Sequence, residues 1–434
     1  MKTPVTLTTL TALTAALLVA APACAATWDA TTSLRRFDTK VAAGLPQTLT
    51  AVVATDDTGV STRAPLRIDE KLDTLVALPD GSHIVTYLGL WNGEAATISR
   101  GDGQLLVDTD EQRASRRRRA TVARFDTAIA SGLPAHVPVD DDLIILDAFG
   151  GDIVFADGSH GQMYNATWHG EPAVATRSGT HLDITSMTAK GIDITGFTAG
   201  SDNVEHEQLP TETTGDDVST ARPAAFASLA RMEAQPVEDL RPNRLTFHLM
   251  LHDDVDMTSQ HIHAGYVAWW LADLQRNVTH GKKVDVLYSQ RIPGVTDMRY
   301  HYMGSLHDWS DVIGDYAREQ HIPRTYKHKF LLVVKGTPEP GRYGRSWQKG
   351  SDGIASVSGR YPELAHQLVH LLGAKHSKAE VRFGGWWCET NMLAPSLLVR
   401  SNCYVYSREN MRLIDDYVRT GDGFAENNRW SEDR

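Results

Sequence analysis

Cysteine is scarce in this chain of 434 residues, which contains three of them, Cys24, Cys388 and Cys403. No pair has the Cys-x-x-Cys spacing of a cysteine-rich zinc site. An excess of positive charge is also missing, since the formal net charge is −11 at pH 7. Because nucleic-acid binding depends on contacts between basic side chains and phosphates, the composition gives no support to a nucleic-acid partner.

A long uninterrupted apolar run is missing as well. The apolar stretch at residues 7–21 contains threonines and is too short to be a convincing membrane span. It follows Lys2 and precedes an Ala-x-Ala cleavage pattern at residues 23–25. We therefore expect a bacterial-type signal peptide at residues 1–25, a periplasmic or secreted product, and no transmembrane segment.

Three histidines near the C-terminus have a distinctive spacing, in the sequence His-Gln-Leu-Val-His-Leu-Leu-Gly-Ala-Lys-His at residues 366–376. His366 and His370 are four residues apart, so on a helix they project from one face. Gly373 can end the helix in a turn that brings His376 back toward the other two. Three imidazoles with one open position form the catalytic kind of zinc site, and imidazole favours Zn²⁺ over Ca²⁺ or Mg²⁺. The alternative is an amphipathic helix that merely contains histidines.

This segment resembles the metzincin metallopeptidases, whose pattern is His-Glu-x-x-His-x-x-Gly-x-x-His followed by a Met-turn. Met392 is the candidate for the Met-turn, in the sequence Cys-Glu-Thr-Asn-Met-Leu-Ala-Pro at residues 388–395. The resemblance covers residues 244–434. It implies a peptide-bond hydrolase in which three histidines bind Zn²⁺ and the methionine packs beneath them.

A glutamate is missing from the position where the metzincin pattern has one, because Gln367 follows the first histidine. In that family the glutamate is the general base, and glutamine has nearly the same shape but cannot accept the proton. Loss of a general base typically lowers the rate by a factor on the order of 10²–10⁴. The sequence therefore predicts very weak or absent hydrolysis of peptides. The alternative is a pseudopeptidase that keeps zinc and the cleft to bind a peptide or a protein partner.

Two carboxylates lie close in sequence to the missing base. Glu363 is one helical turn before Gln367, and Glu389 is beside the Met-turn. An acid at the first turn of a helix is favourable on its own account, because it interacts with the positive end of the helix dipole. We do not expect either carboxylate to replace the base.

The region before the histidines alternates between strand and helix patterns, as the resemblance implies. Strands are expected at 245–251, 284–288 and 330–334, and helices at 267–274, 309–316 and, after the Met-turn, 409–418. The run at 330–334 is apolar throughout, so we expect it to be buried on both faces of a sheet. Residues 353–359 suit an edge strand beside a substrate cleft, where a peptide adds as a further strand.

Cys388 and Cys403 lie on either side of the Met-turn candidate. In an exported protein we expect them to form a disulfide, which closes a loop of about 15 residues and contributes about 3 kcal/mol. Two free buried thiols are the alternative.

The first half of the chain contains a tandem duplication. Shared motifs are Arg-Phe-Asp-Thr at 36–39 and 124–127, Gly-Leu-Pro at 44–46 and 132–134, and Asp-Gly-Ser-His at 80–83 and 157–160. Asp-Gly is a strong hairpin signal, and the flanking residues alternate like half-buried strands. We expect two small, mostly-β modules at residues 28–110 and 120–200. The predicted fold class is α+β, with a metzincin-like mixed sheet and zinc-binding helix after the two modules.

The position of the modules suggests a role in latency. They lie between a signal peptide and a peptidase-like region, and residues 201–243 have the polar, proline-dotted composition of a linker. We therefore consider a propeptide, with a permanent accessory domain that binds a partner as the alternative. Residues 149–152 resemble the Phe-x-Gly-Asp segment with which astacin propeptides place an aspartate on the metal. Asp152 is accordingly a candidate latency switch, and a turn leading into a strand is the alternative reading.

Overall fold

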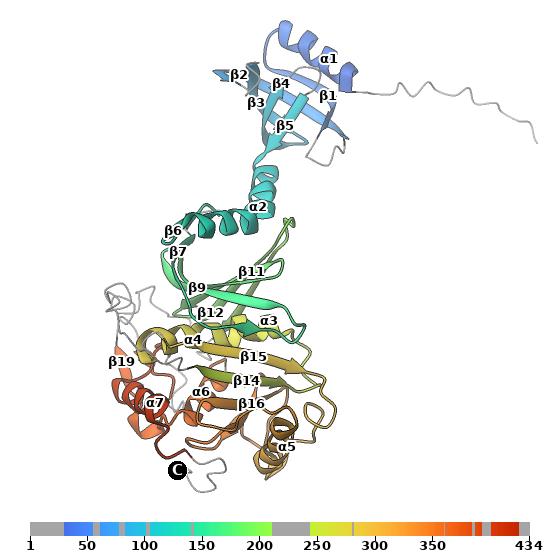
Figure 1. Cartoon of the computed structure of the whole chain (residues 1–434). Helices are drawn as coiled ribbons and strands as arrows, with labels where there is room; N and C mark the ends of the chain where they lie inside the picture. Colours follow the sequence, from blue (N-terminus) through green and yellow to red (C-terminus); the bar gives the residue numbers. More distant parts are fainter. Residues whose placement is uncertain are drawn as a thin grey trace, which may run out of the picture. The chain divides into compact units, whose positions relative to one another are not determined.

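The computed structural model describes residues 30–54, 61–77, 83–100, 105–139, 143–210, 244–279, 282–359, 361–383, 387–392 and 401–424. The chain divides into two compact units, Met1–Arg113 and Ala114–Arg434 (Figure 1). The predicted signal peptide and residues 211–243 of the predicted linker lie outside the described residues.

The first unit contains helix α1 (Ala30–Ala42) and a closed barrel of five strands. The strands are β1 (Gln47–Ala54), β2 (Ser61–Ala77), β3 (His83–Trp91), β4 (Glu94–Arg100) and β5 (Leu105–Thr109). Along β2, buried Leu66 and Ile68 alternate with exposed residues, as expected for a strand with one face in a core. Phe37 of α1 is fully buried in the same core, so the helix covers part of the barrel.

The second unit begins with the second copy of the repeat. Its elements are α2 (Asp110–Ser131, which starts before the unit boundary), β6 (Ala135–Val137), β7 (Leu143–Ala148), β8 (Ile153–Val154), β9 (His160–Trp168), β10 (Glu171–Ser178), β11 (His181–Thr188), β12 (Gly191–Thr198) and β13 (Val204–Pro210). Strands β9 to β13 form an antiparallel meander in which each strand pairs with the next.

Equivalent residues make equivalent contacts in the two copies of the repeat. Each copy has an edge-to-face aromatic pair, with ring centroids 5.2 Å apart in the first and 5.4 Å in the second. Each also has an arginine–aspartate ion pair, at 3.2 Å and 2.8 Å. The residues are Phe37–Tyr87 and Asp38–Arg100 in the first copy, and Phe125–Tyr164 and Asp126–Arg177 in the second. The duplication in the sequence is therefore also a duplication of packing.

The C-terminal region adds a mixed sheet with helices on both faces. Its strands are β14 (Leu245–Leu251), β15 (Val284–Gln290), β16 (His328–Val334), β17 (Gly344–Ser346) and β18 (Asp352–Ser356). Its helical segments are α3 (Ser259–Ile262), η2 (His263–Val267), α4 (Ala268–Asp273), η3 (Leu274–Val278), α5 (Ser305–Glu319), α6 (Glu363–Leu371), η4 (His376–Lys378) and α7 (Arg408–Thr420). Strands β15, β14, β16 and β18 are parallel in that order, and β17 pairs antiparallel with β18. A small separate sheet contains β19 (Val381–Phe383), β20 (Trp387–Glu389) and β21 (Ser401–Asn402).

The contacts of β16 explain why its residues 330–334 are all apolar. Leu331 and Val333 pack into the core that contains residues of α4 and α6, on one face of the sheet. Phe330 and Leu332 pack on the other face, with Trp309 of α5. Both faces are covered, as predicted, so neither set of side chains is polar.

The second copy of the repeat and the C-terminal region share one sheet and one core. Strand β8 pairs in parallel with β15, with Ile153 opposite Val286. The meander thereby joins the C-terminal strands in a single 13-stranded sheet. Met163 and Ile194 of the repeat lie in the same buried cluster as Phe247 of β14.

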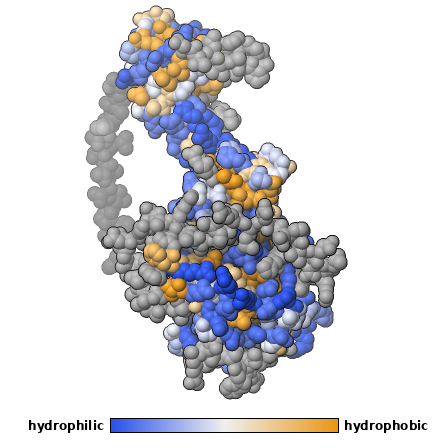
Figure 2. Space-filling model, turned by 90° about the vertical axis from the view of Figure 1, so that its left-hand side faces the viewer, coloured by the Kyte–Doolittle hydropathy of each residue, from blue (hydrophilic) through white to orange (hydrophobic). Residues whose placement is uncertain are grey.

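The chain is α+β, as the sequence predicted, but the predicted edge strand is wrong. Residues 353–359 were expected at the edge, whereas β18 lies between β16 and β17. The edge is β17, whose three residues are too few to show an alternating pattern in the sequence. Within the described residues, no helix combines the length and apolar character needed to span a membrane. Hydrophilic residues cover much of the described surface in Figure 2, with smaller apolar areas between them.

Candidate metal centre

Helix α6 carries two of the three histidines and is held by an apolar face. Leu364, Leu368 and Leu371 are fully buried in the main core, and Pro362 precedes the first residue of the helix. Since these leucines fix the rotation of the helix, His366 and His370 are directed together to its other, half-buried side.

A left-handed turn supplies the third histidine. Gly373 has φ +93°, a value that residues with a Cβ rarely adopt. The Ala374 amide donates to the Val369 carbonyl at 3.0 Å, which closes the end of the helix. The chain then reverses, and His376 at the start of η4 comes to lie against the helix.

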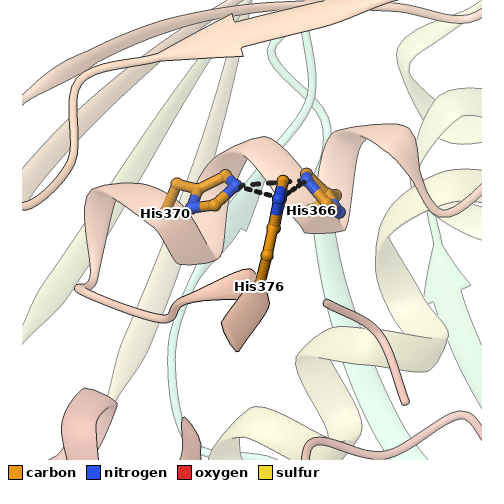
Figure 3. Close-up of side chains that lie close together, drawn as sticks. All are labelled: His366, His370 and His376. Atoms are coloured by element: carbon orange, nitrogen blue, oxygen red, sulfur yellow. Dashed lines mark hydrogen bonds between the residues drawn. The ribbon is translucent and has the colours of Figure 1, made fainter. Parts of the chain in front are cut away.

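The three imidazoles converge through their Nε2 atoms, as predicted from the spacing (Figure 3). The Nε2 atom of His370 lies 3.1 Å from that of His366 and 2.9 Å from that of His376, and the remaining separation is 2.8 Å. Three nitrogens bound to one tetrahedral zinc at about 2.0–2.1 Å stand roughly 3.3 Å apart, so the arrangement is close to that of a ligand set. Among the described residues, this is the only group of three or more histidine, cysteine or acidic side chains that could hold a metal ion.

Hydrogen bonds to the opposite ring nitrogens favour the ligand form of the imidazoles. Nδ1 of His370 lies 3.0 Å from the Ala374 carbonyl and 3.1 Å from Oε1 of Gln348. Both partners are acceptors, so Nδ1 carries the hydrogen and the Nε2 lone pair is available to a cation. His366 has a backbone hydrogen bond at Asn391, and burial, followed by its two histidine neighbours, holds its pKa well below the usual value. A neutral imidazole is the form that binds metal.

The side chain of Gln367 is buried and both ends of its amide are bonded. Ser346 of β17 donates from Oγ to Oε1 at 2.8 Å, and Nε2 donates to Oε1 of Glu363 at 2.8 Å. Gln367 is 6% exposed. A Cβ on Gly344 would lie 2.6 Å from Cγ of Gln367 and would also overlap the Glu363 carboxylate. The glycine at 344 therefore allows the edge strand to approach this pair.

Residues 344–348 are the part of the site that the sequence did not reveal. Gly344 and Ser346 contact Gln367, and Gln348 orients His370. The segment lies about 20 residues before the histidine motif and has no recognisable pattern of its own. The antiparallel pairing of β17 with β18 brings it to the helix.

The Met-turn candidate and the disulfide are both buried. Met392 is fully buried in the core cluster that includes Leu364 and Leu368 of α6. Cys388 and Cys403 form the predicted disulfide, which joins β20 to the residue after β21. Residues 393–395 of the predicted turn lie outside the described residues.

Asp152 lies immediately before β8 and has other partners. Its carboxylate forms an ion pair with Arg244 at 3.0 Å, and its backbone amide donates to Asp285 at 2.8 Å. It does not belong to the group of side chains that could hold a metal. Its role as a latency switch stays a prediction.

Comparison with known proteins adds little to these observations. No protein-family model and no curated protein matches the chain. A crystal structure of metalloproteinase-II from Bacteroides fragilis is similar to it over 63% of this chain and 86% of that chain, with 13% sequence identity and a TM-score of 0.41. A similarity of this degree carries no argument about function, so the functional interpretation rests on the residues of this chain.

Proposed function

We propose that this chain is a secreted or periplasmic zinc metalloendopeptidase of metzincin type whose hydrolysis of peptides is very weak or absent. The observation that carries the proposal is the convergence of three Nε2 atoms, 2.8–3.1 Å apart, beside an amide at the position of the general base. The sequence pattern and the parallel sheet that precedes helix α6 support it further.

The donor set fits zinc. His366, His370 and His376 would hold the ion through neutral imidazole nitrogens, which suit Zn²⁺ better than the oxygen-preferring Ca²⁺ and Mg²⁺. When bound, zinc supplies a Lewis acid that polarises a carbonyl and acidifies water. Gln348 would orient His370, and the backbone at Asn391 would orient His366.

Gln367 explains why peptide hydrolysis is predicted to be very weak or absent. An amide does not take up a proton near neutral pH, and here its two ends are already bonded to Ser346 and Glu363. The residue therefore links β17 to α6 without accepting a proton. Loss of this step lowers the rate by a factor on the order of 10²–10⁴.

The second candidate function is a pseudopeptidase that binds a peptide or a protein partner. The bonding of Gln367 to Ser346 and Glu363 favours it, because the amide is part of the packing between β17 and α6 rather than a free group at the metal centre. Among the described strands, β17 is the last of its sheet and pairs with β18, and a peptide could add there as a further strand.

Metal analysis tests the proposed centre. The purified full chain, stripped with chelator and dialysed against zinc, is expected to retain one zinc per chain, and His370→Ala is expected to retain much less. His321→Ala, at an exposed position in the turn after α5, is the matched control. An empty site in a folded protein at saturating zinc would contradict the proposal.

A peptide assay separates the two functions. We expect turnover of a mixed peptide library at or near the detection limit, whereas titration of non-cleaved peptides shows binding if the second function holds. Robust turnover by the unmodified chain would refute the role given to Gln367.

A further inference from the structure

A pocket of about 470 Å³ lies between strands β11 to β13 and the start of helix α3. Its volume is within the range of small-molecule sites, about 300–1,000 Å³. The acidic and histidine residues that argue for its chemistry are Asp157, His181, Asp183, Glu205, Glu207 and His261. None of the described lining residues is lysine or arginine.

Two carboxylates of the pocket lining flank a hollow at one glycine. Asp183 on β11 is opposite Gly196 on β12, which is opposite Glu205 on β13. A Cβ on Gly196 would lie 3.3 Å from Oδ1 of Asp183 and 3.8 Å from Oε2 of Glu205. The backbone of Gly196 is not in the left-handed region, so its conformation does not require glycine. A methyl group at 196 would crowd Asp183, so the glycine keeps this hollow open between the two carboxylates.

The two carboxylates have no partners of opposite charge in the described structure. The other two carboxylates of the pocket do have partners. Glu207 pairs with His261 at 3.3 Å, and Asp157 accepts a hydrogen bond from Gln260 at 2.8 Å. Asp183 is half-buried, and burial, followed by the charge of Glu205, raises its pKa to about 7. Two carboxylates in one partly desolvated hollow repel each other, and a cation between them relieves that cost.

We propose that this pocket binds an organic cation, an ammonium or guanidinium group held between Asp183 and Glu205. Such a group has several N–H donors on different sides and can bond both carboxylates across the hollow. A metal ion fits less well, because the histidine centre is the only described place where three ligand groups converge. The cation could belong to a lysine or arginine side chain of a peptide or to a free polyamine.

Calorimetric titration of the full chain tests this site. The probes are agmatine, spermidine and a capped tripeptide with a central arginine, and the same tripeptide with neutral citrulline is the control ligand. We expect the cationic probes to bind and the citrulline peptide not to bind. A tripeptide that binds more tightly than agmatine identifies a side chain as the source of the cation, and the reverse order identifies a free amine.

Variants locate the site. Asp183→Asn and Glu205→Gln each remove one carboxylate, and Gly196→Ala fills the hollow while keeping both. Each is expected to weaken binding at least about tenfold. Asp202→Asn, which removes an equal charge at an exposed ion pair outside the pocket, is the matched control and is expected to bind normally.

Three results would overturn the proposal. The first is that no cationic probe binds. The second is that the probes bind equally well to the unmodified chain, to Gly196→Ala and to both carboxylate variants. The third is that Ca²⁺ or Zn²⁺ binds and Asp183→Asn abolishes this binding, while the organic cations do not bind. Thermal unfolding checks that each variant folds. If a carboxylate variant does not fold, Gly196→Ala still tests the site. The site shares no residue with the metal centre, so its failure leaves the proposed function untouched.

Discussion

Gln367 donates a hydrogen bond from Nε2 to Oε1 of Glu363 at 2.8 Å, across one turn of helix α6. The contact has a definite polarity, because a carboxylate only accepts and the amide nitrogen only donates. Ser346 meets the other end of the amide as a donor. The surroundings of residue 367 therefore suit a glutamine, and a glutamate there would face a second carboxylate.

Restoring the general base is expected to require two changes. Gln367→Glu alone places two carboxylates in contact, and like charges so close cannot both ionise. The double variant, Glu363→Gln with Gln367→Glu, reverses the hydrogen bond between the two positions, so that residue 363 donates and residue 367 accepts. Ser346 can still donate to residue 367. We expect the double variant to hydrolyse peptides about 10²-fold faster than the unmodified chain, and the single variant to gain much less. Initial rates on a fluorogenic peptide library measure this.

Glu363→Gln alone is the control for that comparison and is expected to stay inactive. A Gln367→Glu variant as active as the double variant would show that Glu363 does not oppose a glutamate at 367.

Gln348→Ala is expected to weaken zinc binding about 10–100-fold. Gln348 accepts from Nδ1 of His370 and donates to the Ala374 carbonyl at 3.0 Å, so its loss removes one of the two bonds at Nδ1 that orient the imidazole. Competition with a chromophoric chelator measures the affinity. Gln320→Ala, at the exposed end of α5, is the matched control. Equal affinities in the two variants would argue against an orienting role.

Removing the disulfide is expected to destabilise the C-terminal region. The bond between Cys388 and Cys403 spans a sequence separation of 15, and its loss costs about 3 kcal/mol. The double variant Cys388→Ser and Cys403→Ser should therefore unfold at lower temperature than the oxidised chain by calorimetry. A reductant is the control, since it should lower the midpoint of the unmodified chain and leave that of the double variant unchanged. An equal midpoint in the oxidised chain and the double variant would contradict the prediction.

The pocket carboxyl of Asp183 is expected to make stability depend on pH. Its folded-state pKa of about 7 lies above the ordinary value of 3.8, so folding favours the protonated form. Ionisation of this carboxyl therefore lowers the free energy of unfolding. The loss is absent below about pH 4, grows between pH 4 and pH 7, and is complete above pH 7. The other titratable residues of the pocket are Asp157, His181, Glu205, His206, Glu207 and His261.

The measurement is the difference in unfolding free energy between the unmodified chain and Asp183→Asn, in urea, from pH 4 to pH 8. We expect the variant to gain relative stability as pH rises, by an amount on the order of a few kcal/mol. A difference that does not change with pH would show that Asp183 titrates normally.

Cleavage of the linker is expected to leave the two parts of the second unit together. Strand β8 pairs with β15, and the Tyr404 hydroxyl donates to the Thr188 carbonyl at 2.7 Å. A protease site inserted within residues 211–243 should yield two fragments that elute together in native gel filtration and separate in denaturant. Elution of a folded C-terminal fragment by itself would favour the propeptide over the permanent accessory domain.

The local features of the site were predictable because short spacings determine them. His366 and His370 share a helix face through a four-residue interval, and Gly373 is suited to the turn that returns His376. Residues 330–334 of β16 were visible as an apolar run, since burial on both faces leaves no polar alternation.

Contacts between distant segments were not predictable. Ser346 reaches Gln367 because β17 folds back along β18, and the register of that pairing is not encoded in three residues. The sequence also showed the repeat but not that β8 of its second copy joins β15, since strand pairing depends on what each sheet edge meets in space.

The sequence by itself determined the histidine triad, the glutamine beside it and the duplicated modules, because each is a matter of residue identity and short intervals. The tertiary structure alone decided which neighbours bind the Gln367 amide and that Asp183 and Glu205 flank a hollow at Gly196. Those relationships arise from the packing of strands and helices far apart in the chain, and the free energy of such packing is a property of the whole fold.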